Sequence, residues 1–96
     1  MRKYNGEFCN MLSVISDRRN FAIVASIMEN GPQSFAALQK ELGLRKSELK
    51  SHISDLLSCS YLFSKKAGRK NVYHLNRATV VPLLKLIHNH LTKYHK

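Results

Sequence analysis

The segment that most constrains the fold is a pair of short amphipathic stretches on either side of a glycine. In the first stretch, three apolar residues recur at helical spacing: Phe35, Leu38 and Leu42. Gly43 follows, and glycine reaches the left-handed conformation that ends a helix at little cost. The next stretch, Lys46 to Ser58, again has an apolar period of three and four residues. Residues 33–57 are therefore predicted to form two helices joined by a tight turn, with Ser34 as the N-cap of the first.

The second helix of this pair divides into two faces when its residues are placed at intervals of about 100°. One face is apolar and is predicted to be buried: Leu49, Ile53 and Leu56, with Leu57 at its edge. The opposite face carries a row of small hydroxyl side chains: Ser47, Ser51, Ser54 and Ser58. A merely solvated face would more often carry Glu, Lys and Gln, because serine is a mediocre helix former. Serines permit close approach to a DNA groove and can hydrogen-bond to base edges, so the pattern favours a helix-turn-helix that reads DNA.

The charge balance indicates the same class of partner. Sixteen Lys and Arg against six Asp and Glu give a net charge of +10, which favours binding to a polyanion such as a nucleic acid. An anionic membrane surface is the alternative, but the cations gather at residues 45–50 and 65–70 instead of along one amphipathic helix. No apolar run approaches the roughly 20 residues of a membrane span, and the first residues lack the pattern of a secretion signal. We expect one domain spanning residues 1–96, in the cytoplasm and without a membrane partner.

Two runs of β-forming residues follow the helix pair, at residues 61–65 and 71–75. The segment between them contains Gly68, which suits a tight turn, so the pattern predicts a β-hairpin. Cations gather around its tip: Lys65, Lys66, Arg69 and Lys70, with Arg77 more distant. Such a tip is interpreted as a wing that holds a phosphate backbone or enters a minor groove. The alternative is an edge hairpin whose lysines only prevent aggregation.

Two amphipathic helices are predicted before the helix pair. Residues 7–15 and residues 18–30 each have a helical apolar period. Ser16 and Asp17 lie between them and offer side-chain oxygens that can cap the second helix. Residues 1–6 are expected to be flexible.

The last helix is predicted to begin near Thr79, capped by that side chain, with Pro82 in its first turn. It is apolar on more than one side and therefore requires two surfaces to bury it. One surface is the domain itself, and the other is interpreted as a second subunit, with residues 80–95 as a dimerisation helix. The residues predicted at the dimer interface are Phe8, Leu12, Leu84, Ile87, Leu91 and Tyr94. Packing wholly within the monomer is the alternative.

In order and spacing, residues 12–75 resemble the winged-helix transcription regulators of the ArsR type. Three segments carry the likeness: SDRRNFAIVASIMENG, ELGLRKSELKSHISDLL with His52, and AGRKNVYHL. The resemblance implies a mainly α (α+β) fold, a winged helix-turn-helix with a two-stranded β-wing and N- and C-terminal dimerisation helices. Together with the predicted reading helix, wing and dimerisation helix, it leads us to expect a homodimeric, sequence-specific regulator of double-stranded DNA, acting as a repressor. Arg18 and Asn20 replace the usual Pro and Arg of the family, and Lys50 replaces a serine, so no operator sequence is carried over.

Metal or redox sensing is the alternative within the same fold. The resemblance associates metal sensing with a CxC pair, which this chain lacks, or with Asp and His ligands on the terminal helix. Three histidines crowd that helix: His88, His90 and His95. His90 points about 200° away from His88, and no carboxylate follows Asp55, so we predict a polar tail with no metal site and no cofactor. Cys9 and Cys59 form no CxxC motif and are both predicted to be small buried hydrophobic residues.

The residues that we expect to contact DNA lie before the helix pair, on its second helix and on the wing: Gln33, Ser34, Arg45, Lys46, Ser47, Lys50, Ser51, Ser54, Lys65, Lys66, Arg69 and Lys70. No Ser-His-Asp spacing and no glycine-rich phosphate loop is recognisable, so no catalytic residue is predicted and the chain is not expected to be an enzyme. A protein-interaction winged helix inside a larger transcription or replication assembly is the alternative from another class.

Overall fold

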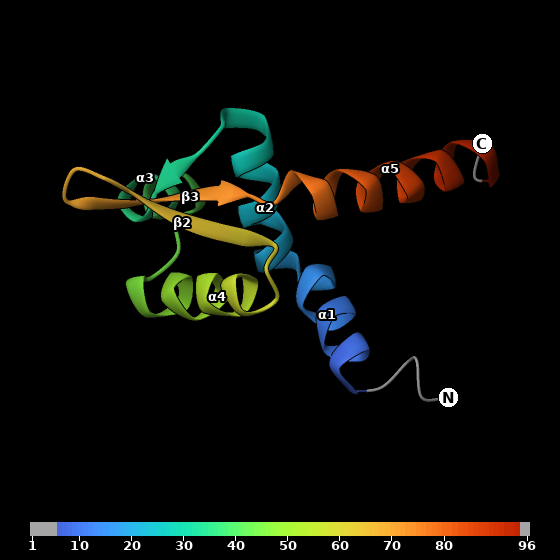
Figure 1. Cartoon of the computed structure of the whole chain (residues 1–96), viewed down its shortest axis with the longest axis horizontal. Coiled ribbons are helices and arrows are strands. Elements are labelled where there is room, and N and C mark those ends of the chain that lie inside the picture. Colours follow the sequence, from blue (N-terminus) through green and yellow to red (C-terminus); the bar gives the residue numbers. More distant parts are fainter. Residues whose placement is uncertain (1–5, 95–96) are drawn as a thin grey trace.

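The computed structural model describes residues 6–94, which form helices around a small antiparallel sheet (Figure 1). In chain order the elements are α1 (Gly6–Ser16), α2 (Arg18–Asn30), β1 (Gln33–Ser34), α3 (Phe35–Leu42), α4 (Lys46–Ser58), β2 (Leu62–Ala67), β3 (Lys70–Leu75) and α5 (Arg77–Tyr94). The predicted bounds of α2 and α4 are confirmed. The sequence predicts that residues 1–6 are flexible. Residues 1–5 lie outside the described range, and Gly6 is the first residue of α1.

The predicted hairpin is confirmed and is joined by one strand that the sequence pattern missed. β2 and β3 pair antiparallel, with Leu62 opposite Leu75 at their base. Gly68 occupies the turn with a φ of 66°. β1 pairs with the other side of β3, Gln33 opposite Tyr73, which gives the strand order β1-β3-β2. A strand of two residues is too short to show the alternation by which strands are recognised.

The core lies between α2, α3, α4, the base of the hairpin and the first turn of α5, and α1 contributes Val14 and Ile15 to it. Its fully buried large side chains are Ile23, Val24, Leu38, Leu49, Leu56 and Val80. The apolar face predicted for α4 is confirmed, since Ile53 on the same face is only 3% exposed. Burying a side chain of this kind contributes about 1.5–3 kcal/mol. These contacts hold α4 against the domain by one face and leave its serine face outside.

Two predicted helix caps are confirmed. The Asp17 carboxylate accepts hydrogen bonds from the backbone N–H groups of Asn20 and Arg19, each at 3.0 Å. The bond from Asn20 is the main reason that the pKa of the Asp17 carboxyl lies below its usual value. At the start of α3, the Ser34 hydroxyl accepts a hydrogen bond from the N–H of Ala37 at 3.2 Å.

The prediction for the last helix is wrong at its start. α5 begins at Arg77, so Thr79 lies inside the first turn and does not cap it. The carbonyl of Asn76 accepts a hydrogen bond from the Thr79 N–H at 3.2 Å, and the Asn76 amide donates to the carbonyl of Ser60 at 2.8 Å. Pro82 therefore lies beyond the first turn, where it removes one backbone N–H from the helix. The pattern placed the start too late because the apolar stripe of the helix begins only after Thr79.

The prediction that both cysteines are buried is correct for one of them. Cys59 is 8% exposed, and the Asn10 amide nitrogen lies 3.8 Å from its Sγ. Cys9 is exposed. It lies near the start of α1, whose buried residues, Val14 and Ile15, are both near its end. Both thiols are free.

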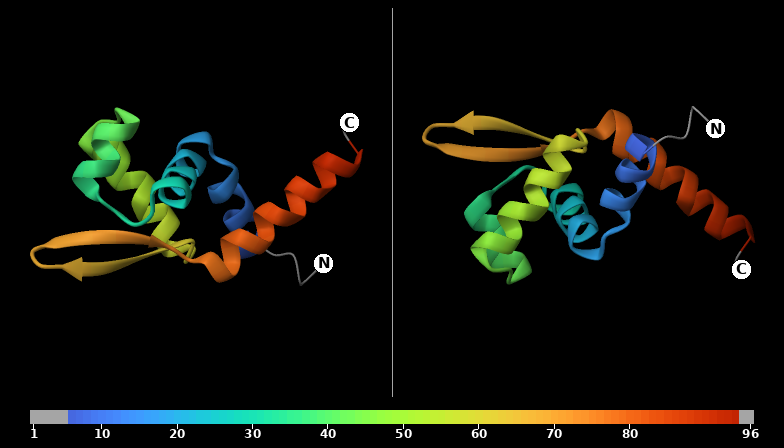
Figure 2. Two further views of the ribbon diagram at one scale, coloured as in Figure 1. Left: turned by 90° about the horizontal axis from the view of Figure 1, so that it is seen from above. Right: turned by 90° about the horizontal axis from the view of Figure 1, so that it is seen from below.

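The molecule measures 43 × 34 × 24 Å and has two distinct ends (Figures 1 and 2). The hairpin, α3 and α4 lie at one end, and the C-terminal half of α5 projects at the other. Every residue from Lys85 to Tyr94 is exposed. No helix within residues 6–94 has the length and apolar character needed to cross a membrane.

Candidate nucleic-acid interface

The turn between α3 and α4 brings the start of α4 to the surface. Gly43 has the left-handed conformation, with φ 64° and ψ 27°, and its N–H donates to the carbonyl of Gln39 at 2.9 Å. A larger residue would be strained at this backbone conformation. Arg45 precedes α4 as its N-cap, and its exposed side chain makes no capping hydrogen bond. The guanidinium group therefore remains available at the leading end of α4.

The exposure predicted for the outer face of α4 is confirmed. Its serines are all exposed: Ser47, Ser51, Ser54 and Ser58. Lys46 and Lys50 are exposed beside them. The Ser58 hydroxyl donates to the carbonyl of Asp55 at 2.8 Å, which occupies the serine furthest from the leading end. Most of this face thus offers short hydroxyl groups next to ammonium groups, the two kinds of donor that bind base edges and phosphates.

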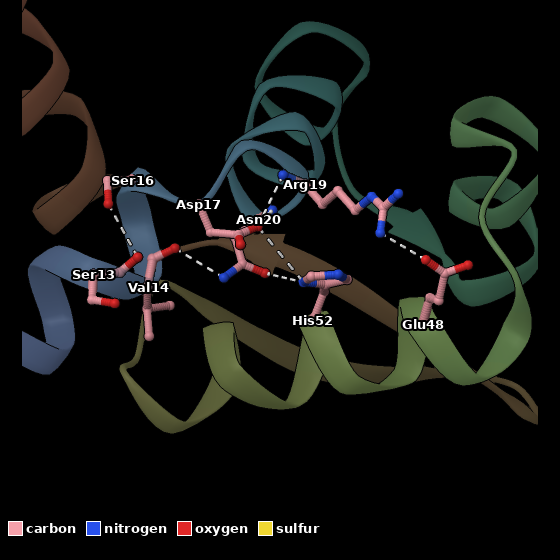
Figure 3. Close-up of polar contacts among 8 residues, drawn as sticks. All are labelled: Ser13, Val14, Ser16, Asp17, Arg19, Asn20, Glu48 and His52. Atoms are coloured by element: carbon pink, nitrogen blue, oxygen red, sulfur yellow. Dashed lines mark hydrogen bonds and ion pairs between the residues drawn. The ribbon is translucent and has the colours of Figure 1, made fainter.

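A chain of hydrogen bonds fixes α4 against the two helices that begin the fold (Figure 3). Asn20 Nδ2 donates to the carbonyl of Val14 at 2.9 Å, and His52 Nδ1 lies 2.8 Å from Asn20 Oδ1. Because the amide oxygen can only accept, His52 Nδ1 carries the hydrogen between them. Asp17 Oδ1 lies 3.8 Å from the same ring nitrogen. The sequence singled out His52 only through the family resemblance, and it gave no signal for the partner on α2.

An exposed ion pair lies beside this chain of hydrogen bonds (Figure 3). Arg19 Nη1 is 2.8 Å from Glu48 Oε2, and the two side chains are 60% and 34% exposed. Such a pair contributes only about 0–1 kcal/mol to stability. Its effect on charge is more important, because it neutralises the acidic residue nearest the leading end of α4. Lys46 and Lys50 form no ion pair with any residue in the described range.

The cations of the hairpin are also exposed and unpaired by carboxylates within residues 6–94: Lys65, Lys66, Arg69 and Lys70. Lys65 differs from the others because its Nζ lies 5.4 Å from the ring centre of Phe63, which stacks on His74 at 5.1 Å. Adjacent residues of a strand point to opposite faces, so Lys66 points away from this stack. Its cross-strand partner Asn71 lines the groove described next.

A groove of about 630 Å³ lies between α4, the start of α3 and β3. It brings together five of the expected site residues from separate elements: Ser34, Lys46, Lys50, Ser54 and Lys70. The sequence did not identify the apolar side chains of the groove, which include Phe35, Ile53, Leu57 and Tyr73. Phe35 and Ile53 fit the pattern of core residues, and no local signal distinguishes a core residue from the floor of a groove.

Gln33 is held away from this groove. Its side-chain nitrogen donates to the carbonyl and the hydroxyl of Ser26, at 3.1 and 2.8 Å, and so ties β1 to α2. The hydroxyl of Ser34 caps α3, but the residue lines the groove. The sequence predicts that Gln33 and Ser34 both contact DNA; the structure ties the side-chain amide of Gln33 to Ser26 and places Ser34 at the groove.

The residues predicted at a dimer interface lie at the other end of the molecule. Five of them are exposed: Phe8, Leu12, Ile87, Leu91 and Tyr94. Leu84 is half-buried and, with Leu12, Phe21 and Ile87, lines a second groove of about 610 Å³ between α1 and α5, beside the start of α2. Leu86, which faces a different side of α5, is 71% exposed. An apolar surface of this kind is typical of an interaction site.

The histidines of α5 do not form a metal cluster in the described residues. His88 and His90 are both exposed, and the His90 ring lies 4.7 Å from the ring of Tyr94. Within residues 6–94, no group of three or more His, Cys, Asp or Glu side chains is placed to hold a metal ion. His95 lies outside the described residues.

Solved structures with the same arrangement of elements are known. HlyU from Vibrio cholerae is 22% identical, with a TM-score of 0.76 over 100% of both chains. NolR from Sinorhizobium fredii is 18% identical, with a TM-score of 0.79 over 97% of this chain and 89% of NolR. The transcriptional repressor BigR from Xylella fastidiosa is 20% identical, with a TM-score of 0.70 over 98% of this chain and 92% of BigR.

Similar structures also include an ArsR-family transcriptional regulator, 13% identical over 94% of this chain. No model of a protein family matches the chain, and no curated protein sequence does. The likeness is therefore one of structure. The chain has the winged helix-turn-helix fold of ArsR-type regulators, as its sequence resemblance predicts.

Proposed function

We propose that this chain regulates transcription by binding double-stranded DNA sequence-specifically as a homodimer. One observation carries the proposal: the exposed serine and lysine face of α4 lies beside a hairpin whose cations have no carboxylate partner in the described residues. DNA supplies phosphates to neutralise such cations. Its major groove is about 12 Å wide and admits an α-helix with short side chains on its outer face.

In this proposal α4 is the recognition helix. Lys46, Ser47, Lys50 and Ser51 contact base edges, and Ser54 lies further along the same face. Arg45, at the N-cap, contacts a guanine or a phosphate. Lys66, Arg69 and Lys70 hold the phosphate backbone next to the groove that α4 enters, with Lys65 on the other face of β2 contributing charge. Ser34 and the first N–H groups of α3 face a phosphate at the edge of the site.

The dimer places two copies of α4 on one face of the duplex. Recognition helices in such dimers enter successive major grooves, about 34–36 Å apart. The apolar side chains on α1 and α5 supply the surface for the second copy, because their exposure to water is unfavourable by about 25 cal/mol per Å². We infer repression as the outcome, since a dimer bound across a promoter blocks access to it, and BigR, of similar structure, is a transcriptional repressor.

The test is selection of bound duplexes from a random pool, followed by titration of the recovered sequence across a range of salt concentrations. We expect a two-fold symmetric sequence and an affinity that falls linearly with salt on logarithmic axes. Lys85→Ala, at the opposite end of the molecule, serves as a charge-matched control for substitutions in the site. Recovery of no preferred sequence would contradict the proposal and favour a protein-interaction role for the fold.

A further inference from the structure

The groove between α4, α3 and β3 is lined by both ammonium groups and apolar side chains, and DNA would contact only the ammonium groups. Its rim carries the exposed ammonium groups of Lys46, Lys50 and Lys70. Its floor is apolar and includes Phe35 and Leu57, both half-buried. A phosphodiester backbone is polar and charged, so it would engage the rim and leave the floor uncovered. A ligand with an apolar body would cover the floor and remove its apolar surface from water.

The positive charge of the groove determines which sign of charge the ligand carries. No Asp or Glu lines it, and none of its three lysines forms an ion pair with another residue in the described range. Glu48, on the same helix as two of these lysines, is neutralised by Arg19 at 2.8 Å. A cation would therefore be repelled, whereas a carboxylate or phosphate would be attracted.

The size of the groove fits a small molecule. Its volume of about 630 Å³ lies within the range of roughly 300–1,000 Å³ that is typical of small-molecule sites. Such sites combine a mainly apolar lining with a few polar groups that orient the ligand. The three ammonium groups supply this orientation at the rim.

We propose that this groove binds a small amphipathic anion, with its acidic head group at Lys46, Lys50 and Lys70 and its apolar body against Phe35, Leu57 and Tyr73. Binding itself does not depend on the DNA proposal. The regulatory consequence rests on it: because Lys46 and Lys50 also belong to the proposed reading face of α4, the bound anion competes directly with the operator.

The first experiment measures binding to the full chain by the shifts of its backbone amide resonances. Decanoate is the probe, used below its micelle-forming concentration, with acetate and decyltrimethylammonium as controls for its head group and its chain. We expect decanoate to shift the amides of Phe35, Leu57 and Tyr73 and to bind at least about tenfold more tightly than either control. Equal binding of the cationic control, or shifts confined to the apolar groove between α1 and α5, would overturn the proposal.

Two substitutions locate the site. Lys70→Ala, on an exposed position that leaves the core untouched, should weaken decanoate binding severalfold, whereas Lys85→Ala should not change it. Leu57→Ser should weaken it more, because it removes apolar floor, and thermal unfolding shows whether that variant folds. If Lys70→Ala binds decanoate as tightly as the original chain, the head group is not at the rim and the proposal fails.

Competition separates the ligand site from the DNA proposal. With the selected duplex, decanoate should release DNA at concentrations set by its own dissociation constant. Decanoate that occupies the groove without releasing DNA would overturn the competitive mechanism. If no duplex binds at all, the DNA proposal fails, while the amide shifts still decide whether the groove binds amphipathic anions.

Discussion

The two ends of this molecule both expose side chains that would be stabilised by a binding partner, but the side chains are polar and charged at one end and apolar at the other. At the end formed by α4 and the hairpin, exposed lysines and serines lack a charged partner among the described residues. At the end formed by α1 and α5, the exposed side chains are large and apolar, with Ile87 and Leu91 each 49% exposed. Association at the first end should therefore depend on salt, and association at the second on protein concentration and burial of apolar surface.

The comparison is tested most strongly by placing a charge at the apolar end. Ile87→Asp should convert a dimer to a monomer and reduce DNA affinity by about a hundredfold or more, because burial of an unpaired carboxylate costs several kcal/mol. Sedimentation and DNA titration measure the two effects. Asn89→Asp adds a similar charge on the opposite side of α5 and should leave the dimer intact. A dimer that survives Ile87→Asp would assign that residue to the monomer surface.

A substitution on the reading face should change which sequence is bound. Lys50→Ala removes a donor next to the serine row, and loss of one base contact costs about 1–3 kcal/mol. We expect roughly ten- to hundredfold weaker binding to the selected duplex and a relaxed preference at one base pair in each half-site. An equal loss of affinity for every duplex, with the base preference unchanged, would instead show that Lys50 contacts phosphate.

The hydrogen bonds among Val14, Asn20 and His52 connect the two ends, since they join α1, α2 and α4. Asn20→Ala leaves a backbone carbonyl and a ring N–H without their partner and should cost about 1–3 kcal/mol of unfolding free energy. Arg19→Ala, next in the chain, removes only an exposed ion pair and should cost less than about 1 kcal/mol. Denaturant titration measures both, and equal effects would contradict the assigned roles.

The wing substitutions have a smaller and less specific effect. Lys66→Ala and Lys70→Ala should each weaken binding to every duplex and reduce the salt slope by about one unit, because each removes one phosphate contact. Lys85→Ala is the matched control and should leave the slope unchanged. Wing variants that retain the full slope would exclude the hairpin from the DNA contact surface.

The smallest expected effect is a loss of folding stability at acidic pH through the Asp17 carboxyl group. Because the pKa of Asp17 is lowered in the folded chain, its contribution to stability is present above the unfolded value of 3.8. That contribution is lost as the pH falls from there through the folded pKa. Asp17→Asn keeps a capping oxygen without this titration. The stability of the original chain relative to that variant should therefore decline only below about pH 4 in thermal unfolding; a decline nearer neutral pH would require another group.

Local periodicity was sufficient to place α2 and α4 at their observed bounds, because an amphipathic helix repeats its own pattern every few residues. It failed where the determining contact is distant in the chain. β1 exists only because Gln33 and Ser34 pair with β3, and α5 starts where Asn76 bonds to Ser60. Cys9 and Cys59 look alike in sequence, yet only the second is covered by packed neighbours.

The sequence by itself determined the helix pair, the serine row and the positive hairpin, since each is a repeat or a cluster within one short segment. Only the tertiary structure decided that Lys46, Lys50 and Lys70 border one groove, and that its floor is apolar. Those residues come from α4 and β3, which are separated along the chain. Side chains from separate elements converge only when the core packs, and no local pattern encodes that convergence.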